Sequence, residues 1–417
     1  MSLAATAPVS RFHKTDDQVR TYMNRSLDRA LLDRRITQTD ADLIREFIAE
    51  ARATAHISND RAFKLAYTLI GWREFVGPFA DLTTAGIFAG MDALAMATKA
   101  DGSPRYTANT KADYTNFLKR FVTWLYENGY APNVRIEKIR KIRTATYDAV
   151  TKTAEMMLSE DEVRAMIEAC TNSRDRALVA VLYEGAFRIG EIATLRWGQV
   201  RFSEWNCSIT VSFKTKKPRT IPIIMALPYL VQWRNDYPVS YAEDGFVFLT
   251  EGRHRQLQYA GTTKQLRRIA KRAGIEKHVT PHLLRHSRIT NLVKAGTNES
   301  IIKRIAWGSQ STKMMGTYLH LADEDIETEM ARVAGVEPPD RKRRRASLEP
   351  RQCPRCFRIN APTDRYCPCG LGLTGEAVDE RRSAEAQIWS DPGFRAEVEE
   401  AARRAMARRA GAGDRSL

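Results

Sequence analysis

The sequence lacks the long apolar runs that mark a membrane-spanning protein. None of its 417 residues falls in a run of about eighteen apolar residues. The N-terminal sequence MSLAATAPVSRFHKTDDQ also lacks the apolar core of a signal peptide. We therefore expect neither export nor membrane insertion, and a protein that works in the cytoplasm.

Cysteine is scarce, with six residues in the whole chain. Cys170 and Cys207 are isolated, which argues against a disulfide framework. The other four cysteines cluster near the C-terminal end, and in a reducing compartment such a cluster indicates a metal site. They are Cys353, Cys356, Cys367 and Cys369.

Acidic residues are outnumbered by basic ones, 50 against 66, which gives a net charge of +16. A soluble chain this basic most often binds nucleic acid, although a membrane-surface or ribosomal protein would share the charge. The length suggests two or three domains, and a hydrophobic content of 43% suffices for ordinary buried cores.

The N-terminal segment, residues 16–147, has the pattern of a helical bundle. From residue 110 to residue 130 the apolar side chains recur with helical spacing, and the helix should stop at Gly129. Further helices are expected at residues 60–75 and 83–97. We expect this bundle to hold a partner without catalysing a reaction, and residues 137–152 to form a basic linker.

A new domain is predicted to begin where Ser159 and Glu162 form a capping box. The helix that follows would turn Cys170 toward a core, and a second helix should cover residues 174–184. After a short break comes Arg188, with Glu191 three residues later. This pair is either a structural ion pair or an arginine oriented for a function, and the two readings stay open here.

Alternating apolar residues on either side of a basic turn predict a β-hairpin. Ile209, Val211 and Phe213 precede the turn KTKKPRT, and Ile221 and Ile223 follow it. The turn should present four cations at its tip, which could clamp a phosphate backbone. These cations are Lys214, Lys216, Lys217 and Arg219.

Two more segments complete this region. Residues 245–250, GFVFLT, are a candidate third strand. The sequence TTKQLRRIAKRAG predicts a helix whose apolar residues leave a basic face for phosphate contacts. That face comprises Lys264, Arg267, Arg268, Lys271 and Arg272.

The sequence TPHLLRHSRITNLVKAG predicts a helix that begins at Pro281 and is capped by Thr280. His282 and Arg285 would then share one face near the positive end of the helix, which suits an anion such as phosphate. The alternative is a solvated basic face that includes Arg285, His286 and Arg288. A single tyrosine, Tyr318, follows in the sequence MMGTYLHL.

Taken in order, these motifs resemble the tyrosine recombinase (integrase) family over residues 159–330. The matching pieces are GAFRIGEIATLRWGQV, VSFKTKKPRTIPI, TPHLLRHSRITNLVKAG and the Tyr-Leu-His sequence at Tyr318. The N-terminal bundle is similar, more loosely, to the core-binding domain of that family. The resemblance implies a mainly α fold with a small antiparallel β-sheet.

The resemblance also implies a role for each motif residue. Tyr318 would attack a DNA phosphodiester and form a 3′-phosphotyrosyl link, with Arg188 and Arg285 as phosphate clamps. His282 would act as a hydrogen-bonding acid or base, and Lys214 as general acid. No catalytic metal or ATP is expected from this chemistry.

Two positions depart from the family pattern. The family places a Gly followed by His or Trp about ten residues before the tyrosine, whereas this chain has Ala306-Trp307-Gly308-Ser309. We favour Trp307 for that position over Ser309, since an indole donates a hydrogen bond, while a merely packing tryptophan is the alternative. In the hairpin, Lys216 remains a rival to Lys214.

After Tyr318 the chain turns acidic, and residues 321–334 are expected either to contact a neighbouring subunit or to form a solvated helix. A basic linker follows, with the sequence RKRRR at residues 341–345. The four clustered cysteines resemble a zinc ribbon with one shortened Cys-x-Cys knuckle, and we expect a structural zinc there. Residues 376–410 should be helical, with a break near Pro392.

Together these expectations describe a site-specific DNA recombinase. The predicted divisions are a helical DNA-clamping domain (1–150), a catalytic domain (151–337), a linker and zinc-ribbon-like segment (338–375) and a helical tail (376–417). The expected partner is double-stranded DNA, bound by a homo-tetramer. The expected reaction is integration or excision of a mobile element, or resolution of joined replicons. The zinc appendage suggests an archaeal setting, by resemblance alone.

Three other functions would account for part of this pattern. A type IB topoisomerase would use nearly the same chemistry without a defined site. A non-catalytic DNA-binding regulator would keep the basic surfaces and have no use for Tyr318. A metal-dependent nuclease would need clustered carboxylates beside the basic motifs, and these motifs contain none.

Overall fold

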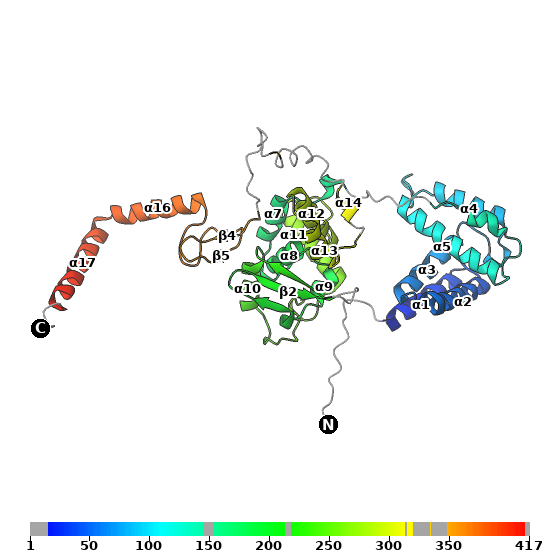
Figure 1. The fold of residues 1–417 in the computed structure, drawn as a ribbon, viewed down its shortest axis with the longest axis horizontal. Coiled ribbons are helices and arrows are strands. Elements are labelled where there is room, and N and C mark those ends of the chain that lie inside the picture. The colour runs from blue at the N-terminus through cyan, green and yellow to red at the C-terminus, as the bar shows by residue number, and fades with distance from the viewer. Residues whose placement is uncertain are drawn as a thin grey trace, which may run out of the picture. The chain divides into compact units, whose positions relative to one another are not determined.

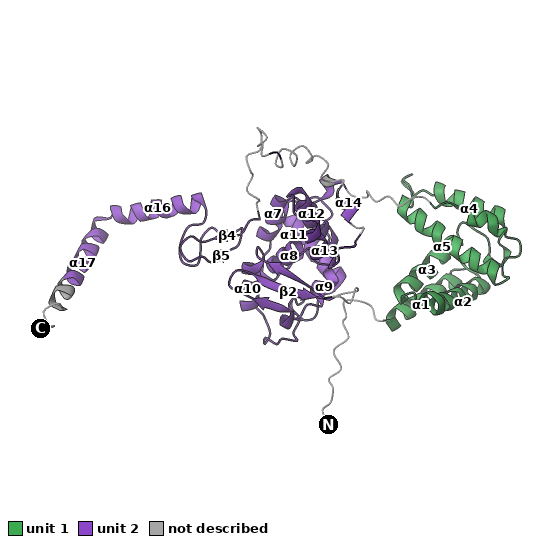
Figure 2. Ribbon diagram, viewed as in Figure 1, with its two compact units in different colours: residues 1–151 green, residues 152–417 purple. Residues whose placement is uncertain are grey.

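The computed structural model describes residues 16–144, 153–212, 218–312, 315–319, 334 and 348–412. The chain forms two compact units, residues 1–151 and residues 152–417 (Figure 2). The described residues are mainly helical, with two small antiparallel sheets (Figure 1), so the predicted fold class is confirmed. No described helix combines the length and apolar character that crossing a membrane requires.

The first unit consists of helices packed around one apolar core. Its longest helix begins at the cap Thr107 and buries Phe117, Phe121 and Leu125 against the other helices. The chain leaves this helix through Gly129, whose positive φ of 77° suits glycine. The helices are α1 (Asp16–Leu32), α2 (Gln38–Ala55), α3 (Asn59–Trp72), α4 (Thr84–Met96), α5 (Ala108–Glu127) and α6 (Ile136–Arg140), with a short 3-10 turn at Phe79–Asp81.

The second unit contains the described helices that follow α6. Its first full helix starts with the predicted capping box, in which the side chain of Ser159 accepts the amide of Glu162 at 3.1 Å. Figure 1 shows several of these helices gathered next to a three-stranded sheet. They are α7 (Glu160–Glu168), α8 (Ser173–Glu184), α9 (Ile189–Ala193), α10 (Leu227–Asn235), α11 (Tyr259–Arg272), α12 (Pro281–Lys294), α13 (Glu299–Trp307) and α14 (Gly316–Leu319), with 3-10 turns at Ala154–Met156 and Trp197–Gln199.

The sheet has the strand order β1 (Val200–Phe202), β2 (Cys207–Val211) and β3 (Arg219–Ile223), all antiparallel. Ile209 lies opposite Ile221, and both are buried, as the alternating pattern predicted. The predicted third strand at residues 245–250 is wrong. That segment contributes only isolated bridges at Phe246 and Leu249, and β1 is the third strand.

Helix α12 packs against α8, α13 and α14, while α13 also contacts β3. This arrangement brings four chain segments that are far apart in the sequence to one place. They are the α8–α9 junction, the start of β3, the first turns of α12 and the α13–α14 region.

The C-terminal part contains the hairpin β4 (Arg351–Gln352) and β5 (Ile359–Asn360), then α16 (Gly375–Ser390) and α17 (Pro392–Ala412). The predicted helical tail and its break near Pro392 are confirmed. The basic run at residues 341–345 and the acidic segment 321–334, apart from Ala334, lie outside the described residues.

Candidate active site

The start of α12 has the predicted capping arrangement. The Thr280 hydroxyl accepts the amide N–H of Leu283 at 3.1 Å, and Pro281 is the first helical residue. His282 is exposed beside this N-terminus, whereas Arg285, one turn later, is only 3% exposed. A solvated basic face is therefore wrong for Arg285.

Arg285 is held by two main-chain carbonyls from different parts of the chain. Its guanidinium donates to the carbonyl oxygen of Ala186 and, at 2.6 Å, to that of Ala306. Burial, together with the charges of Arg188 and Arg219, lowers the pKa of Arg285 to about 9. The side chain thus stays charged at neutral pH, in a fixed position and close to other cations.

The carbonyl of Ala186 is turned toward Arg285 by an unusual backbone. Ala186 is fully buried between α8 and α9 and has a φ of 46°, which a side chain with a Cβ adopts at a cost. Such strain persists where the surrounding structure enforces it, and here it provides one of the two acceptors of Arg285.

Arg188 lies two residues after Ala186 and is held in place by Glu191. The amide of Arg188 donates to one carboxylate oxygen at 2.7 Å, and its guanidinium reaches the other at 3.2 Å. The side chain of Glu191 is 2% exposed, while that of Arg188 is 31% exposed. The predicted ion pair therefore exists, and it leaves part of the arginine accessible.

Arg219 was predicted at the hairpin tip, and this is wrong. It begins β3 on the same buried side as Ile221 and Ile223, and it is 9% exposed. Its guanidinium donates to Oε2 of Glu191 at 2.6 Å, the same oxygen that accepts the Arg188 amide. Among the described residues its Nη1 has no hydrogen-bond partner, so one buried donor there is left over.

The end of α13, at Gly308, lies next to the Arg219 side chain. Gly308 ends that helix with a φ of 69°, and a Cβ at this position would lie 3.4 Å from the Cδ of Arg219. Gly308 therefore lies against the Arg219 side chain.

Tyr318 lies on α14 and is 3% exposed. Burial raises the pKa of its phenol to about 12, while the positive charges of Arg285 and Arg188 act in the opposite direction. Its hydroxyl is hydrogen-bonded to Nδ1 of His286. The structure thus brings Arg188, Arg285 and Tyr318 together, and adds His286 and Arg219, to which the sequence analysis gave no catalytic role.

The structure also separates the two candidates in the Ala306–Ser309 sequence. The Trp307 ring lies 5.9 Å from the Tyr318 ring and 5.6 Å from the Arg285 guanidinium carbon. Ser309 is exposed, with its hydroxyl 3.2 Å from that of Ser311. Trp307 is the residue that reaches the tyrosine, and its catalytic role stays a prediction.

His282 contacts His286, the residue that is hydrogen-bonded to Tyr318. The His282 and His286 rings lie 4.7 Å apart in an edge-to-face arrangement. Lys214 and Lys216 lie outside the described residues, as do Phe213 and Lys217. The choice between the two lysines as general acid therefore stays open.

The four clustered cysteines come together in space. Their sulfur atoms all lie within 4.8 Å of one another, and two pairs, Cys353 with Cys369 and Cys356 with Cys367, are 3.6 and 3.5 Å apart. The shortened knuckle therefore does not prevent closure of the cluster. Cys170, in contrast, is 4% exposed and its pKa is raised to about 12 by burial, as expected of an inert thiol.

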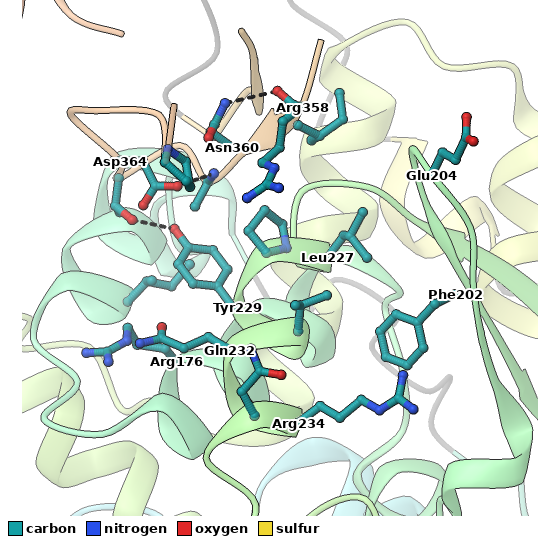
Figure 3. Close-up of a pocket in the computed structure, with 18 of the residues that line it drawn as sticks. Arg176, Phe202, Glu204, Leu227, Tyr229, Gln232, Arg234, Arg358, Asn360 and Asp364 are labelled. Atoms are coloured by element: carbon teal, nitrogen blue, oxygen red, sulfur yellow. Dashed lines mark hydrogen bonds between the residues drawn. The ribbon is translucent and has the colours of Figure 1, made fainter. Parts of the chain in front are cut away.

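The cysteine module, residues 348–374, is seated on α10. Figure 3 shows Tyr229 of α10 pointing toward the module, where its hydroxyl lies 2.7 Å from that of Thr363. An open groove of about 1320 Å³ runs along this seam, with Arg234 and Arg358 among its lining residues.

Known proteins match the second unit. Residues 156–325 match the model of the phage integrase family. Transposase A from transposon Tn554 of Staphylococcus aureus is 29% identical over 227 residues, which cover 51% of this chain and 58% of the relative. The chain thus spans little more than half of that relative. A tyrosine recombinase of Thermosipho africanus is 27% identical, covering 54% and 75%.

Solved structures share the fold. The XerH site-specific recombinase bound to its palindromic difH substrate has a TM-score of 0.50 at 16% identity, covering 77% of this chain and 98% of that one. A lambda integrase dimer bound to a COC′ core site has a TM-score of 0.51 at 15% identity, covering 67% and 76%. The fold is that of the tyrosine recombinases. Within it, residues 156–325 match the phage integrase family model.

Proposed function

We propose that this protein is a site-specific DNA recombinase, which cleaves and rejoins double-stranded DNA through a 3′-phosphotyrosyl intermediate. The observation that carries the proposal is the position of the buried Tyr318 phenol, which lies close to Arg285 and Arg188 and is hydrogen-bonded to His286. The family match and the net charge of +16 support a DNA phosphate as the anion that these arginines receive.

In the proposed reaction Tyr318 attacks phosphorus and the DNA 5′ oxygen leaves. Arg188 and Arg285 stabilise the negative charge that builds up on the other phosphate oxygens, and each such donor contributes about 3 kcal/mol. Lys214, or Lys216, gives the leaving oxygen its proton. His282 and Trp307 donate hydrogen bonds to the phosphate, and a second 5′ hydroxyl reverses the attack.

The test uses a library of nicked duplexes made from genomic fragments of the host, in which the nick releases a short strand and traps the covalent product. We expect a protein–DNA adduct on a denaturing gel for the wild type and for Tyr67→Phe, an exposed tyrosine of the first unit. Tyr318→Phe should bind DNA without an adduct. Equal adducts from Tyr318→Phe would contradict the proposal.

The trapped sites then serve to separate recombination from relaxation. Strand exchange between two duplexes carrying the trapped site is expected of a recombinase that assembles as a tetramer on DNA. Adducts without exchange, together with relaxation of supercoils by a monomer, would indicate topoisomerase activity instead. Counting protomers per DNA complex by mass photometry tests the tetramer, to which the acidic segment 321–334 would contribute contacts.

We further propose that the cysteine cluster holds a structural zinc ion. Zinc–thiolate bonds of about 2.3 Å in a tetrahedron place the sulfur atoms about 3.8 Å apart, which the observed separations approach. Four thiolates leave no open position, so the ion would stabilise the module without entering the reaction. We expect bound zinc by mass spectrometry in the wild type and in Cys170→Ala, and its loss in Cys369→Ser. Unchanged zinc in Cys369→Ser would contradict this site.

A further inference from the structure

His286 is the side chain that touches the reacting oxygen of Tyr318. It follows Arg285 on α12, one turn after His282. Its Nδ1 is hydrogen-bonded to the Tyr318 hydroxyl, and the two rings lie 5.5 Å apart at an angle of 31°. His282, by contrast, approaches the ring of His286 and is itself exposed.

The buried phenol needs such a partner. Because burial raises its pKa to about 12, Tyr318 is protonated at neutral pH. Attack on phosphorus therefore requires a group that removes the proton as the new bond forms. A neutral imidazole is suited to this task, since histidine titrates at about 6.5 in model peptides.

We infer that His286 is the general base for Tyr318, and this inference rests on the proposed recombinase function. In the neutral tautomer that carries its proton on Nε2, His286 accepts the hydrogen bond of the phenol through Nδ1. As the bond from the phenolic oxygen to phosphorus forms, the proton passes to Nδ1 and the bond to the 5′ oxygen breaks. The general acid of the hairpin protonates that leaving oxygen, so charge and protons balance.

The surroundings favour transfer in this direction once DNA is bound. Arg285 on the same helix and Arg188 before α9 act on the phenol and stabilise its anion, and Arg219 lies beyond them next to Glu191. From its own helix, His282 faces the His286 ring. The imidazolium that forms would lie beside the phosphodiester, whose negative charge offsets it.

The test is single-turnover cleavage of the trapped site by His286→Asn across a range of pH. The asparagine side chain reaches the position of Nδ1 and can accept the hydrogen bond, but it cannot take up a proton. Removal of a general base lowers such rates by about 100-fold or more. We expect that loss at neutral pH, and a steeper rise of the rate with pH than in the wild type.

Further measurements distinguish a folding defect from a chemical one. Thermal unfolding and DNA affinity of His286→Asn should match those of His254→Asn, an exposed histidine in a loop. For His286→Ala, added imidazole should restore adduct formation. A substrate with a 5′-bridging sulfur, which leaves without a proton, should not rescue His286→Asn, because the missing group is the base.

The outcomes distinguish the two proposals. A wild-type adduct together with wild-type rate and pH profile in His286→Asn would overturn the role of His286 and leave the recombinase function standing. Rescue of His286→Asn by the bridging-sulfur substrate would also overturn it, since His286 would then serve the leaving group. Absence of any adduct from the wild type would instead contradict the recombinase function itself.

Discussion

Helices α11 and α12 are both rich in basic residues, yet they use their charges in opposite ways. The five cations of α11 are all exposed, and the buried residues Leu266, Ile269 and Ala270 form one stripe. Helix α12 buries Arg285 to 3% exposure and leaves His286 and Arg288 half-buried. A basic helix can therefore be a solvated face or the wall of a buried site.

The difference arises from what packs around each helix. Helix α12 is contacted by α8, α13 and α14, so its basic side chains meet carbonyls and rings from other segments. A charge held in this way has a fixed position that another side chain cannot easily supply. Exposed charges, in contrast, contribute to DNA affinity mainly through how many of them contact phosphates.

Arg285→Lys should have the largest effect. A lysine ammonium has no fork with which to bond both Ala186 and Ala306 while facing a phosphate. We expect adduct formation at saturating DNA to fall by about 100-fold to 1000-fold. Single-turnover cleavage measures this, with the exposed Arg382→Lys as control. A rate equal to that of the control would contradict the buried-clamp assignment.

The next largest effect is expected for Arg219→Met. The change leaves the nearly buried carboxylate of Glu191 with Arg188 alone, so we expect the free energy of unfolding to fall by about 3 kcal/mol. Cleavage should also slow, because Glu191 orients Arg188. Urea unfolding of Arg219→Met, Glu191→Gln and the double variant forms a cycle in which additive losses would exclude the coupling.

Changes on α11 should act on binding instead. We expect Lys264→Ala, Arg268→Ala and Lys271→Ala each to reduce the slope of log affinity against log salt by about 1. Cleavage at saturating DNA should persist, because these side chains are exposed. Salt titrations of DNA affinity measure the slopes. An unchanged slope in all three variants would remove α11 from the DNA surface.

Arg288→Lys should have the smallest effect and sharpens the contrast within α12. Arg288 stacks over Tyr183 at 5.4 Å and donates to the carbonyl of Glu184 at 3.3 Å. Lysine keeps the charge, so we expect a loss of about 1 kcal/mol in unfolding free energy and normal cleavage. A large loss of cleavage with normal stability would instead place Arg288 among the catalytic arginines.

The sequence predicted features that depend on neighbours along the chain. The cap of α12, the capping box of α7 and the pairing of Ile209 with Ile221 follow from periodicity and hydrogen bonds between nearby residues. The order of the motifs also predicted the resemblance that the family match over residues 156–325 supports, because each motif keeps its local pattern.

Contacts between segments far apart in the sequence could not be predicted from such local patterns. Arg219 meets Glu191 across 28 residues, and Tyr318 meets His286 across 32. One signal was present, since strand alternation puts Arg219 on the same side as Ile221 and Ile223. For His286 the helical spacing gave no equivalent, because its partner lies on another helix.

Locating the covalent bond would show whether Tyr318 is the nucleophile. The wild-type adduct on trapped DNA would be digested with protease and nuclease and sequenced by mass spectrometry. We expect a nucleotide joined through its 3′ phosphate to the Tyr318 oxygen. Attachment to another residue, or through a 5′ phosphate, would contradict this assignment.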